Sequence, residues 1–289
     1  MPAVHSFIKS LKRPPNVTRK SWSSRVSYLH KRARDFVVEI VLLLTRVRKS
    51  FLYDHGGFSA KELEELVTRT GLCNNAGSTP RLIIFLLQES IFVLNVNDIG
   101  SIYASFTACE QNPAFVNVAR NLKSPSVLAD DHSFVQACRE EFQLIITFLT
   151  ESARACPKKV LFLYSLPLDQ DHPLTTGFMV PLQGLILEYP VVFCVADALE
   201  YPEGNCLGHE PMYRYQVIVD VASETASLSF PCFSFSSPVN IVNSRIESNV
   251  CAILSSFQER IDNAISIFPK TIMDGRVVKS QVSLPSVGI

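Results

Sequence analysis

The sequence predicts an α+β fold, or a mixed-sheet α/β fold, in which three or four helices cover a mixed sheet with antiparallel hairpins. Two apolar runs, 81–87 and 91–96, are separated only by the polar triplet Gln88-Glu89-Ser90. Three residues cannot form a crossover helix, so the two runs must pair as antiparallel strands. Apolar residues also recur at helical spacing in several longer segments, which indicates amphipathic helices. Together these patterns exclude a purely parallel, doubly wound sheet.

Helices and strands alternate in the part of the chain that precedes this hairpin. A helix with an apolar face is expected over residues 34–47. The short strand 51–54 follows, and after His55 comes the glycine pair Gly56-Gly57. Residues 59–62 read Ser-Ala-Lys-Glu, a capping box in which the serine and glutamate side chains each bond to the other's main-chain amide. This box predicts a second helix, which ends at Gly71.

After the hairpin, a loop at 97–130 leads to a long helix at 132–154, for which Asp130 or Asp131 is the expected cap. A capping box that begins at Ser244 predicts a last helix, with one apolar stripe, that ends before Pro269. Strands are expected at 160–164, 190–195, 214–221 and 227–235. The last two of these strands are close enough in sequence to form a second hairpin.

The chain has no net charge, but its charges are distributed unevenly. Residues 1–50 hold twelve Lys and Arg against two acidic residues, a net charge of +10, so the remaining residues carry −10. We therefore predict a basic, mobile N-terminal arm at 1–33 and a single globular domain at 34–268. The tail at 269–289 has no strong pattern and is expected to be either an edge strand or a loose segment.

The predicted arm contains one amphipathic segment, whose apolar residues are spaced as on a helix and are surrounded by basic residues. The apolar residues are Trp22, Val26 and Leu29, and the basic residues are Arg19, Lys20, Arg25, Lys31, Arg32 and Arg34. Such a segment suits a protein partner, an anionic membrane surface or a mitochondrial transit peptide. A disordered tail, or a helix packed on the acidic surface of the domain, fits the same residues.

Composition indicates an intracellular globular protein. Apolar residues make up 47% of the chain and charged residues 19%, which excludes a disordered chain. No apolar run approaches the ~20 residues that cross a bilayer, and no apolar signal follows the basic start. The eight cysteines form no closely spaced pairs, so we expect free thiols in a reducing compartment. The expected location is the cytoplasm, or the mitochondrion if the arm is a targeting peptide.

Two polar clusters are candidate sites. Asp54 and His55 leave a strand through a glycine turn, where Asp54 could act as a base or metal ligand and His55 as its proton partner. Asp169, Asp171 and His172 follow a later strand and offer ligands that Mg²⁺ or Mn²⁺ accepts. Both clusters also suit ordinary solvated turns. If they met at one sheet edge, they would form a single metal site.

Other chemical signals are weaker. Cys206 and His209 form a C-x-x-H pair, but no second pair completes a set of four zinc ligands. The chain has no phosphate-binding loop, nucleophile elbow or kinase motif. The aromatic segment 230–235 has no interleaved basic residues, so there is no specific nucleic-acid signature. The sequence therefore assigns no cofactor, catalytic residue or oligomeric state.

Several short segments resemble a family of animal proteins named after open reading frame 74 of human chromosome 1. These segments are 51–54 (Phe-Leu-Tyr-Asp), 189–194 (Tyr-Pro-Val-Val-Phe-Cys), 205–207 (Asn-Cys-Leu) and, after Pro211, 215–219 (Tyr-Gln-Val-Ile-Val). The resemblance spans residues 34–268 and implies a domain of unknown function, with no site residue to carry over. The basic arm and Tyr213-Arg214 depart from the family pattern.

These observations favour a non-enzymatic intracellular protein that binds a partner through its arm or through a sheet edge. The alternative is a metal-dependent or acid/base hydrolase that uses Asp54 and His55 with Asp169, Asp171 and His172. The arm and the lack of a catalytic signature support the first hypothesis, and the two polar clusters support the second. The sequence does not decide whether the protein is an enzyme.

Overall fold

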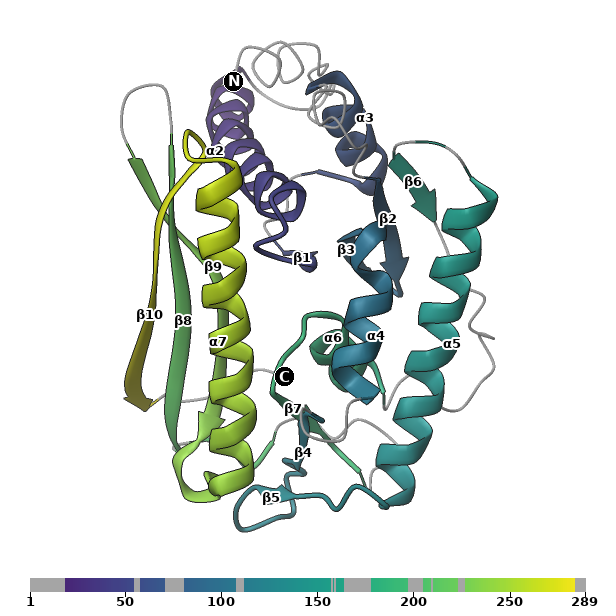
Figure 1. Ribbon diagram of the computed structural model, residues 1–289, viewed down its shortest axis with the longest axis vertical. Coiled ribbons are helices and arrows are strands. Elements are labelled where there is room, and N and C mark those ends of the chain that lie inside the picture. Colours follow the sequence, from purple (N-terminus) through teal and green to yellow (C-terminus); the bar gives the residue numbers. More distant parts are fainter. Residues whose placement is uncertain are drawn as a thin grey trace. The chain divides into compact units, whose positions relative to one another are not determined.

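The computed structural model has an α+β fold, as the sequence predicts (Figure 1). It describes residues 19–54, 58–70, 81–107, 112–156, 158, 160–163, 178–196, 205–208, 210–222 and 227–283. The chain divides into two compact units. Unit 1 comprises Met1–Asp98 and Thr150–Leu166, and unit 2 comprises Ile99–Leu149 and Pro167–Ile289. The predicted extent of a single domain, 34–268, stays a prediction.

Unit 1 is built on a mixed four-stranded sheet with strand order β1-β3-β2-β6. Its described elements are α2 (Arg19–Leu44), β1 (Ser50–Tyr53), α3 (Ala60–Thr70), β2 (Leu82–Leu87), β3 (Ser90–Asn95), the 3-10 helix η2 (Val96–Asp98) and β6 (Val160–Leu163). β2 and β3 pair antiparallel, with Leu87 opposite Ser90, which confirms the predicted first hairpin. β6 joins β2 in parallel, so the sheet is mixed.

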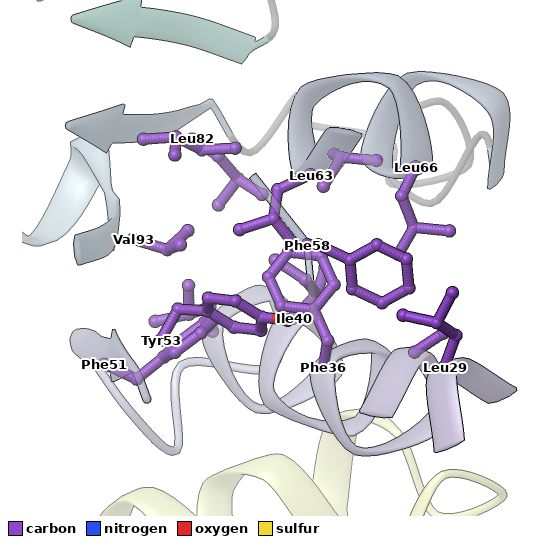
Figure 2. Close-up of a cluster of buried hydrophobic side chains, with 14 residues drawn as sticks. Leu29, Phe36, Ile40, Phe51, Tyr53, Phe58, Leu63, Leu66, Leu82 and Val93 are labelled. Atoms are coloured by element: carbon purple, nitrogen blue, oxygen red, sulfur yellow. The ribbon is translucent and has the colours of Figure 1, made fainter. Parts of the chain in front are cut away.

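The core of unit 1 forms where α2 and α3 pack against the sheet (Figure 2). Phe36 of α2 lies edge-on to the rings of Phe51 and Tyr53 in β1, with ring centroids 5.9 and 5.6 Å away. Leu63 of α3 and Val93 of β3 are fully buried in the same cluster. These contacts place the carboxyl end of β1, with the candidate residue Asp54, next to the start of α3.

Helix α2 corrects the expected position of the first helix, because it runs without a break from Arg19 to Leu44. The predicted boundary between residues 33 and 34 therefore does not coincide with a helix end. Leu29 and Ala33, on the N-terminal side of that boundary, are 1% and 0% exposed and belong to the core of unit 1. Apolar burial of this kind stabilises the fold, so this part of α2 is a piece of the core.

Two ionic contacts fix the C-terminal end of α2. The helix ends where Arg46 takes a left-handed conformation with φ of 61°, as residues just beyond a helix often do. The Arg46 guanidinium binds the carboxylate of Asp98, with Nε 3.1 Å from Oδ1, and this raises the pKa of Arg46. Within the core, Arg48 Nη1 donates to Glu39 Oε2 at 2.8 Å.

The capping box of α3 is confirmed. The Ser59 main-chain N–H donates to Glu62 Oε2 at 2.7 Å, and the Glu62 N–H donates to Ser59 Oγ at 3.4 Å. Both contacts satisfy main-chain amides that have no partner inside the helix. The local sequence was therefore sufficient to locate this helix start.

Unit 2 contains two three-stranded sheets, with strand orders β5-β4-β7 and β10-β8-β9. Its described helices are α4 (Ile99–Thr107), α5 (Ser133–Ala155, of which residues to Leu149 belong to this unit), α6 (Met179–Ile186), the 3-10 helix η3 (Val239–Ile241) and α7 (Ser244–Ile267). Its strands are β4 (Ala114–Asn117), β5 (Ser126–Val127), β7 (Val191–Cys194), β8 (Pro211–Ala222), β9 (Ser227–Pro238) and β10 (Ile272–Ser283).

The structure corrects one sequence prediction and confirms another. The segment 97–130, expected to be a loop, contains η2, α4, β4 and β5. These elements are short, so their apolar periodicity is too brief to stand out in the sequence. The predicted second hairpin is confirmed as β8 and β9, which pair antiparallel from Met212 opposite Pro238 to Ala222 opposite Ser227.

Two predicted helix caps are also corrected. At α5 the cap is His132, whose Nδ1 accepts from the Phe134 N–H at 3.2 Å. Asp130, one of the two expected caps, binds Arg139 of α5 and Arg245 of α7 instead. Partial burial works against the charge of Asp130, but Arg245 and then Arg139 outweigh it and hold the pKa of Asp130 below its usual value.

At α7 the cap is Asn243, one residue before the predicted Ser244. Asn243 Oδ1 accepts from the Ile246 N–H at 3.0 Å. Asparagine and serine are both good caps, so the sequence pattern alone could not separate two adjacent candidates.

A largely buried ion pair connects the residue pair that follows α6 to α7. Arg260 Nη1 donates to Glu188 Oε2 at 3.1 Å, and the two side chains are 13% and 6% exposed. The Arg260 guanidinium also lies 4.0 Å from the centre of the Phe257 ring, whose neighbour is the Phe233 ring of β9 at 4.3 Å. These contacts hold α7 against the sheet that contains β8, β9 and β10.

The packing of α7 on β10 gives a stability prediction. A Cβ at Gly275 would lie 2.8 Å from two side-chain carbons of Ile261, closer than packed carbons allow. Gly275→Ala should therefore lower the free energy of unfolding of unit 2 by about 1–3 kcal/mol through overpacking. Gly100→Ala is the matched control, because a Cβ there meets nothing within 4 Å.

Urea unfolding of the full chain and of each variant measures this difference. The control should keep or slightly raise stability, because alanine is the better helix former at Gly100 in α4. Ile261→Val removes Cδ1 and keeps Cγ2, so it should relieve the clash only in part when combined with Gly275→Ala. Equal midpoints for the wild-type chain and Gly275→Ala would show that α7 does not pack tightly on β10.

Candidate functional site

The first predicted cluster is described only in part. Asp54 directly follows β1 and is exposed to solvent. His55 lies outside the described residues, as do Asp169, Asp171 and His172 of the second cluster. The convergence of the two clusters, and any metal or acid/base role for them, stays a hypothesis. In the described part of the chain, no group of three His, Cys, Asp or Glu side chains could hold a metal ion.

The residue before Asp54 has a structural environment. The Tyr53 ring packs on Phe36, and burial is the main reason that the pKa of its hydroxyl rises to about 12. The phenol therefore stays neutral near physiological pH. Its hydroxyl has a hydrogen bond to the main chain of Phe58, as buried tyrosine hydroxyls usually have a partner.

The described cysteines support the prediction of free thiols. No disulfide bond involves the described cysteines, which are Cys138, Cys156, Cys194, Cys206, Cys232 and Cys251. Burial raises the pKa of Cys138 and, to a smaller extent, that of Cys206. A thiol with a raised pKa stays protonated at neutral pH, and the protonated form is a poor nucleophile and metal ligand. His209, the predicted companion of Cys206, lies outside the described residues.

The predicted partner surface on the N-terminal segment is changed by the structure. Leu29 is buried in the core of unit 1, and Val26 is partly buried against it, so the apolar stripe faces inward. Lys31 and Arg34 are exposed, and Arg32 lies over the ring of Tyr28 at 4.8 Å. The side chains of Arg19, Lys20, Trp22 and Arg25 lie outside the described residues.

This inward orientation has a physical reason. An amphipathic helix lowers its free energy by covering its apolar stripe, and the sheet of unit 1 supplies the cover. A partner or a membrane would therefore meet the charged side of α2 at Lys31 and Arg34, and Leu29 is not available to it. Among the described residues, no helix has the length and apolar character needed to span a bilayer.

A different surface, formed by β10, has the geometry of a binding edge. In the sheet order β10-β8-β9, β10 pairs with β8 along eleven residue pairs from Ile272 to Ser283. No described strand pairs with its other side. An edge strand has main-chain N–H and C=O groups that point away from the sheet, and these groups can pair with another extended chain. We call this side of β10, over residues 272–283, the β10 edge.

Two cations flank the β10 edge on opposite faces of the sheet. Lys279 is on the face that α7 covers, where its Nζ lies 4.1 Å from the centre of the Tyr213 ring and 5.3 Å from that of Tyr215. Arg276 is on the other face, where its Nη1 lies 3.4 Å from Oδ2 of Asp220. Residues three apart in a strand always point to opposite faces. The two cations therefore stand on opposite faces of β10, and each contacts a residue of β8.

Exposed apolar side chains accompany these cations. Met273 and Val277 of β10 are 54% and 39% exposed, and Ile267 and Phe268 at the end of α7 are 68% and 38% exposed. Met273 and Val277 provide exposed apolar area on β10 itself. The β10 edge thus combines main-chain hydrogen-bonding groups, apolar contact area and two cations.

The charge on this strand contrasts with that of its unit. Unit 2 contains nine Lys and Arg and eighteen Asp and Glu, a net charge of −9, and unit 1 carries +9. Yet Lys270, Arg276 and Lys279, against Asp274, give the segment 270–279 a net charge of +2. Much of the positive charge of an acidic unit is therefore concentrated beside its edge strand.

Sequence reasoning found this strand only as one of two alternatives. The tail was expected to be an edge strand or a loose segment, and the structure makes residues 272–283 an edge strand. The segment lacks the clean alternation of apolar and polar residues, because most of its side chains on both faces are exposed. The adjacent Val277 and Val278 and the β-branched content were the available signals.

The comparisons with known proteins give a family and no activity. A family described as "Domain of unknown function (DUF4504)" matches residues 18–289. The match includes residues 18–33, which sequence analysis placed in the arm, and the tail that forms β10. No curated protein and no solved structure matches the chain. The narrower resemblance to the animal family named above stays a prediction.

Proposed function

We propose that this chain, which belongs to the family of unknown function that matches residues 18–289, is a non-enzymatic interaction protein that binds an extended protein segment along the β10 edge. The observation that carries the proposal is the position of a twelve-residue strand at the border of a sheet. Strand addition at such an edge gives affinity through main-chain hydrogen bonds and specificity through alternate side chains.

The composition of the β10 edge favours a selective partner over self-association. Charged residues on an edge strand hinder edge-to-edge pairing between copies of the same chain. Arg276 and Lys279 would have this effect on self-pairing, while a partner with suitable charges would not be repelled. Val277, between the two cations, adds apolar contact area on the face that α7 covers.

A peptide selection tests the proposal directly. Random twelve-residue peptides displayed on phage are selected on the full chain, and the enriched peptides are then synthesised. We expect them to bind the full chain and to slow amide hydrogen exchange in residues 272–283, because strand addition engages these main-chain groups. Exchange in β2, which lies in the interior of the unit 1 sheet, is the internal control.

Two results would contradict the proposed function. One is a selection that enriches no binding peptide, and the other is a set of binding peptides that leave exchange in β10 unchanged. Peptides that are N-methylated at alternate amides provide a further check, because one of the two methylation patterns should abolish binding by removing the hydrogen bonds to β10. Equal binding of both patterns and of the unmodified peptide would exclude strand addition.

A further inference from the structure

We infer that the segment bound at the β10 edge is acidic and carries two carboxylates three residues apart. This inference rests on the proposed function and specifies the chemistry of the partner. It follows from the two cations, which lie on opposite faces of the same edge, and from the positive charge of segment 270–279 within an acidic unit.

The spacing follows from strand geometry. A partner strand that pairs with β10 has one residue opposite Arg276 and another opposite Lys279, three positions away. In a strand, these two residues point to opposite faces, as Arg276 and Lys279 do. Each cation then meets a carboxylate on its own face of the sheet. Carboxylates two residues apart would both lie on one face, and only one of them could meet a cation.

The residue opposite Val277 is expected to be apolar. Val277 lies on the same face as Lys279 and pairs with Val217, a buried residue of β8. For an antiparallel partner read from its N-terminus, the expected pattern is acidic, any residue, apolar, acidic. For a parallel partner the pattern is acidic, apolar, any residue, acidic.

The two cations are positioned in different ways. Lys279 rests on the rings of Tyr213 and Tyr215 in β8, and this contact orders its side chain on the face that α7 covers. Arg276 has Asp220 beside it, and its side chain is 48% exposed, so the guanidinium has room for a second carboxylate. An arginine presents five N–H donors and can bind two carboxylates at once.

Synthetic peptides test the inference on the full chain by fluorescence anisotropy. The probe is an eight-residue peptide with the central sequence Glu-Thr-Val-Glu between threonines, and its parallel counterpart contains Glu-Val-Thr-Glu. The spacing control contains Glu-Val-Glu-Thr, which has the same composition and net charge. We expect one of the two probes to bind about tenfold more tightly than the spacing control. The affinity of this probe should fall as salt is added, because salt screens charge interactions.

Two charge-reversed double variants of the protein, one at the β10 edge and one elsewhere in unit 2, are compared for peptide binding. Arg276→Glu with Lys279→Glu should weaken binding of the better probe by about tenfold or more, and should improve binding of the same peptide with both glutamates replaced by lysines. Arg120→Glu with Lys123→Glu makes the same change in net charge at two other exposed residues of unit 2, also three apart. This control pair should leave the affinity nearly unchanged. Unfolding midpoints of both double variants confirm that they are folded.

The outcomes separate the inference from the proposed function. Equal affinity for both spacings, or equal losses in the two double variants, would overturn the inference. Neutral or basic peptides that protect β10 from exchange would also overturn it, while the proposed strand addition would stand. A dimer that forms without peptide through β10, seen by sedimentation and lost in the Arg276→Glu and Lys279→Glu variant, would overturn both in favour of a second copy of the chain.

Discussion

Replacement of Glu39 by alanine is expected to lower the free energy of unfolding of unit 1 by about 3–5 kcal/mol. Glu39 lies near the C-terminal end of α2, and its Oε2 accepts from Arg48 Nη1 at 2.8 Å. The two side chains are only 8% and 10% exposed. The loss is large because the variant leaves the Arg48 guanidinium in a poorly solvated place without its carboxylate.

The cause is distinguished by a second variant. Glu39→Leu combined with Arg48→Met removes both charges and keeps similar volumes, so its stability should stay within about 1–2 kcal/mol of the wild-type value, on either side. Urea unfolding of the full chain measures the change in the free energy of unfolding of the whole protein. Hydrogen exchange in β2 and β3 measures the change in unit 1 alone. A loss in the double variant as large as that in Glu39→Ala would contradict an electrostatic cause and would indicate a packing defect.

Leu29→Ala is expected to destabilise unit 1 by about 2–5 kcal/mol. Leu29 is 1% exposed and belongs to the buried cluster that Figure 2 shows between α2, α3 and the sheet. Truncation removes three apolar carbons from this cluster and leaves a cavity that the surrounding side chains can fill only in part. Unfolding midpoints in urea measure the change.

The neighbouring residue Lys31 supplies the control. Lys31 is exposed on the same helix, so Lys31→Ala should change stability by no more than about 0.5 kcal/mol. A chain shortened to begin at residue 34 should be destabilised at least as much as Leu29→Ala, because it loses both Leu29 and Ala33 from the core. Unchanged midpoints for Leu29→Ala and for the shortened chain would instead support a mobile arm at residues 1–33.

The candidate site was accessible to sequence reasoning only in general form. A sheet edge was one of the two expected binding surfaces, and residues 269–289 were one of the segments that could provide it. The opposing cations Arg276 and Lys279 could not be recognised, because their placement depends on the register between β10 and β8. The burial of Leu29 could not be recognised for a related reason, because a sequence shows an apolar stripe but not what covers it.

The sequence by itself determined the features that depend on neighbouring residues. The polar triplet at 88–90 specified the β2–β3 hairpin, and Ser59 with Glu62 specified the start of α3, because hydrogen bonds within a few residues decide both. Apolar periodicity also indicated the α+β fold class, since helices and half-buried strands each have their own repeat.

Only the tertiary structure decided how α2 and β10 are used. The basic charge of residues 1–33 suggested a separate arm, yet burial of Leu29 and Ala33 makes part of that segment core. Residues 272–283 lack a clear alternation, yet pairing with β8 makes them an edge strand. In both cases contacts with residues distant in sequence stabilise the observed conformation. The local sequence does not specify which distant residues a segment will pack against or pair with.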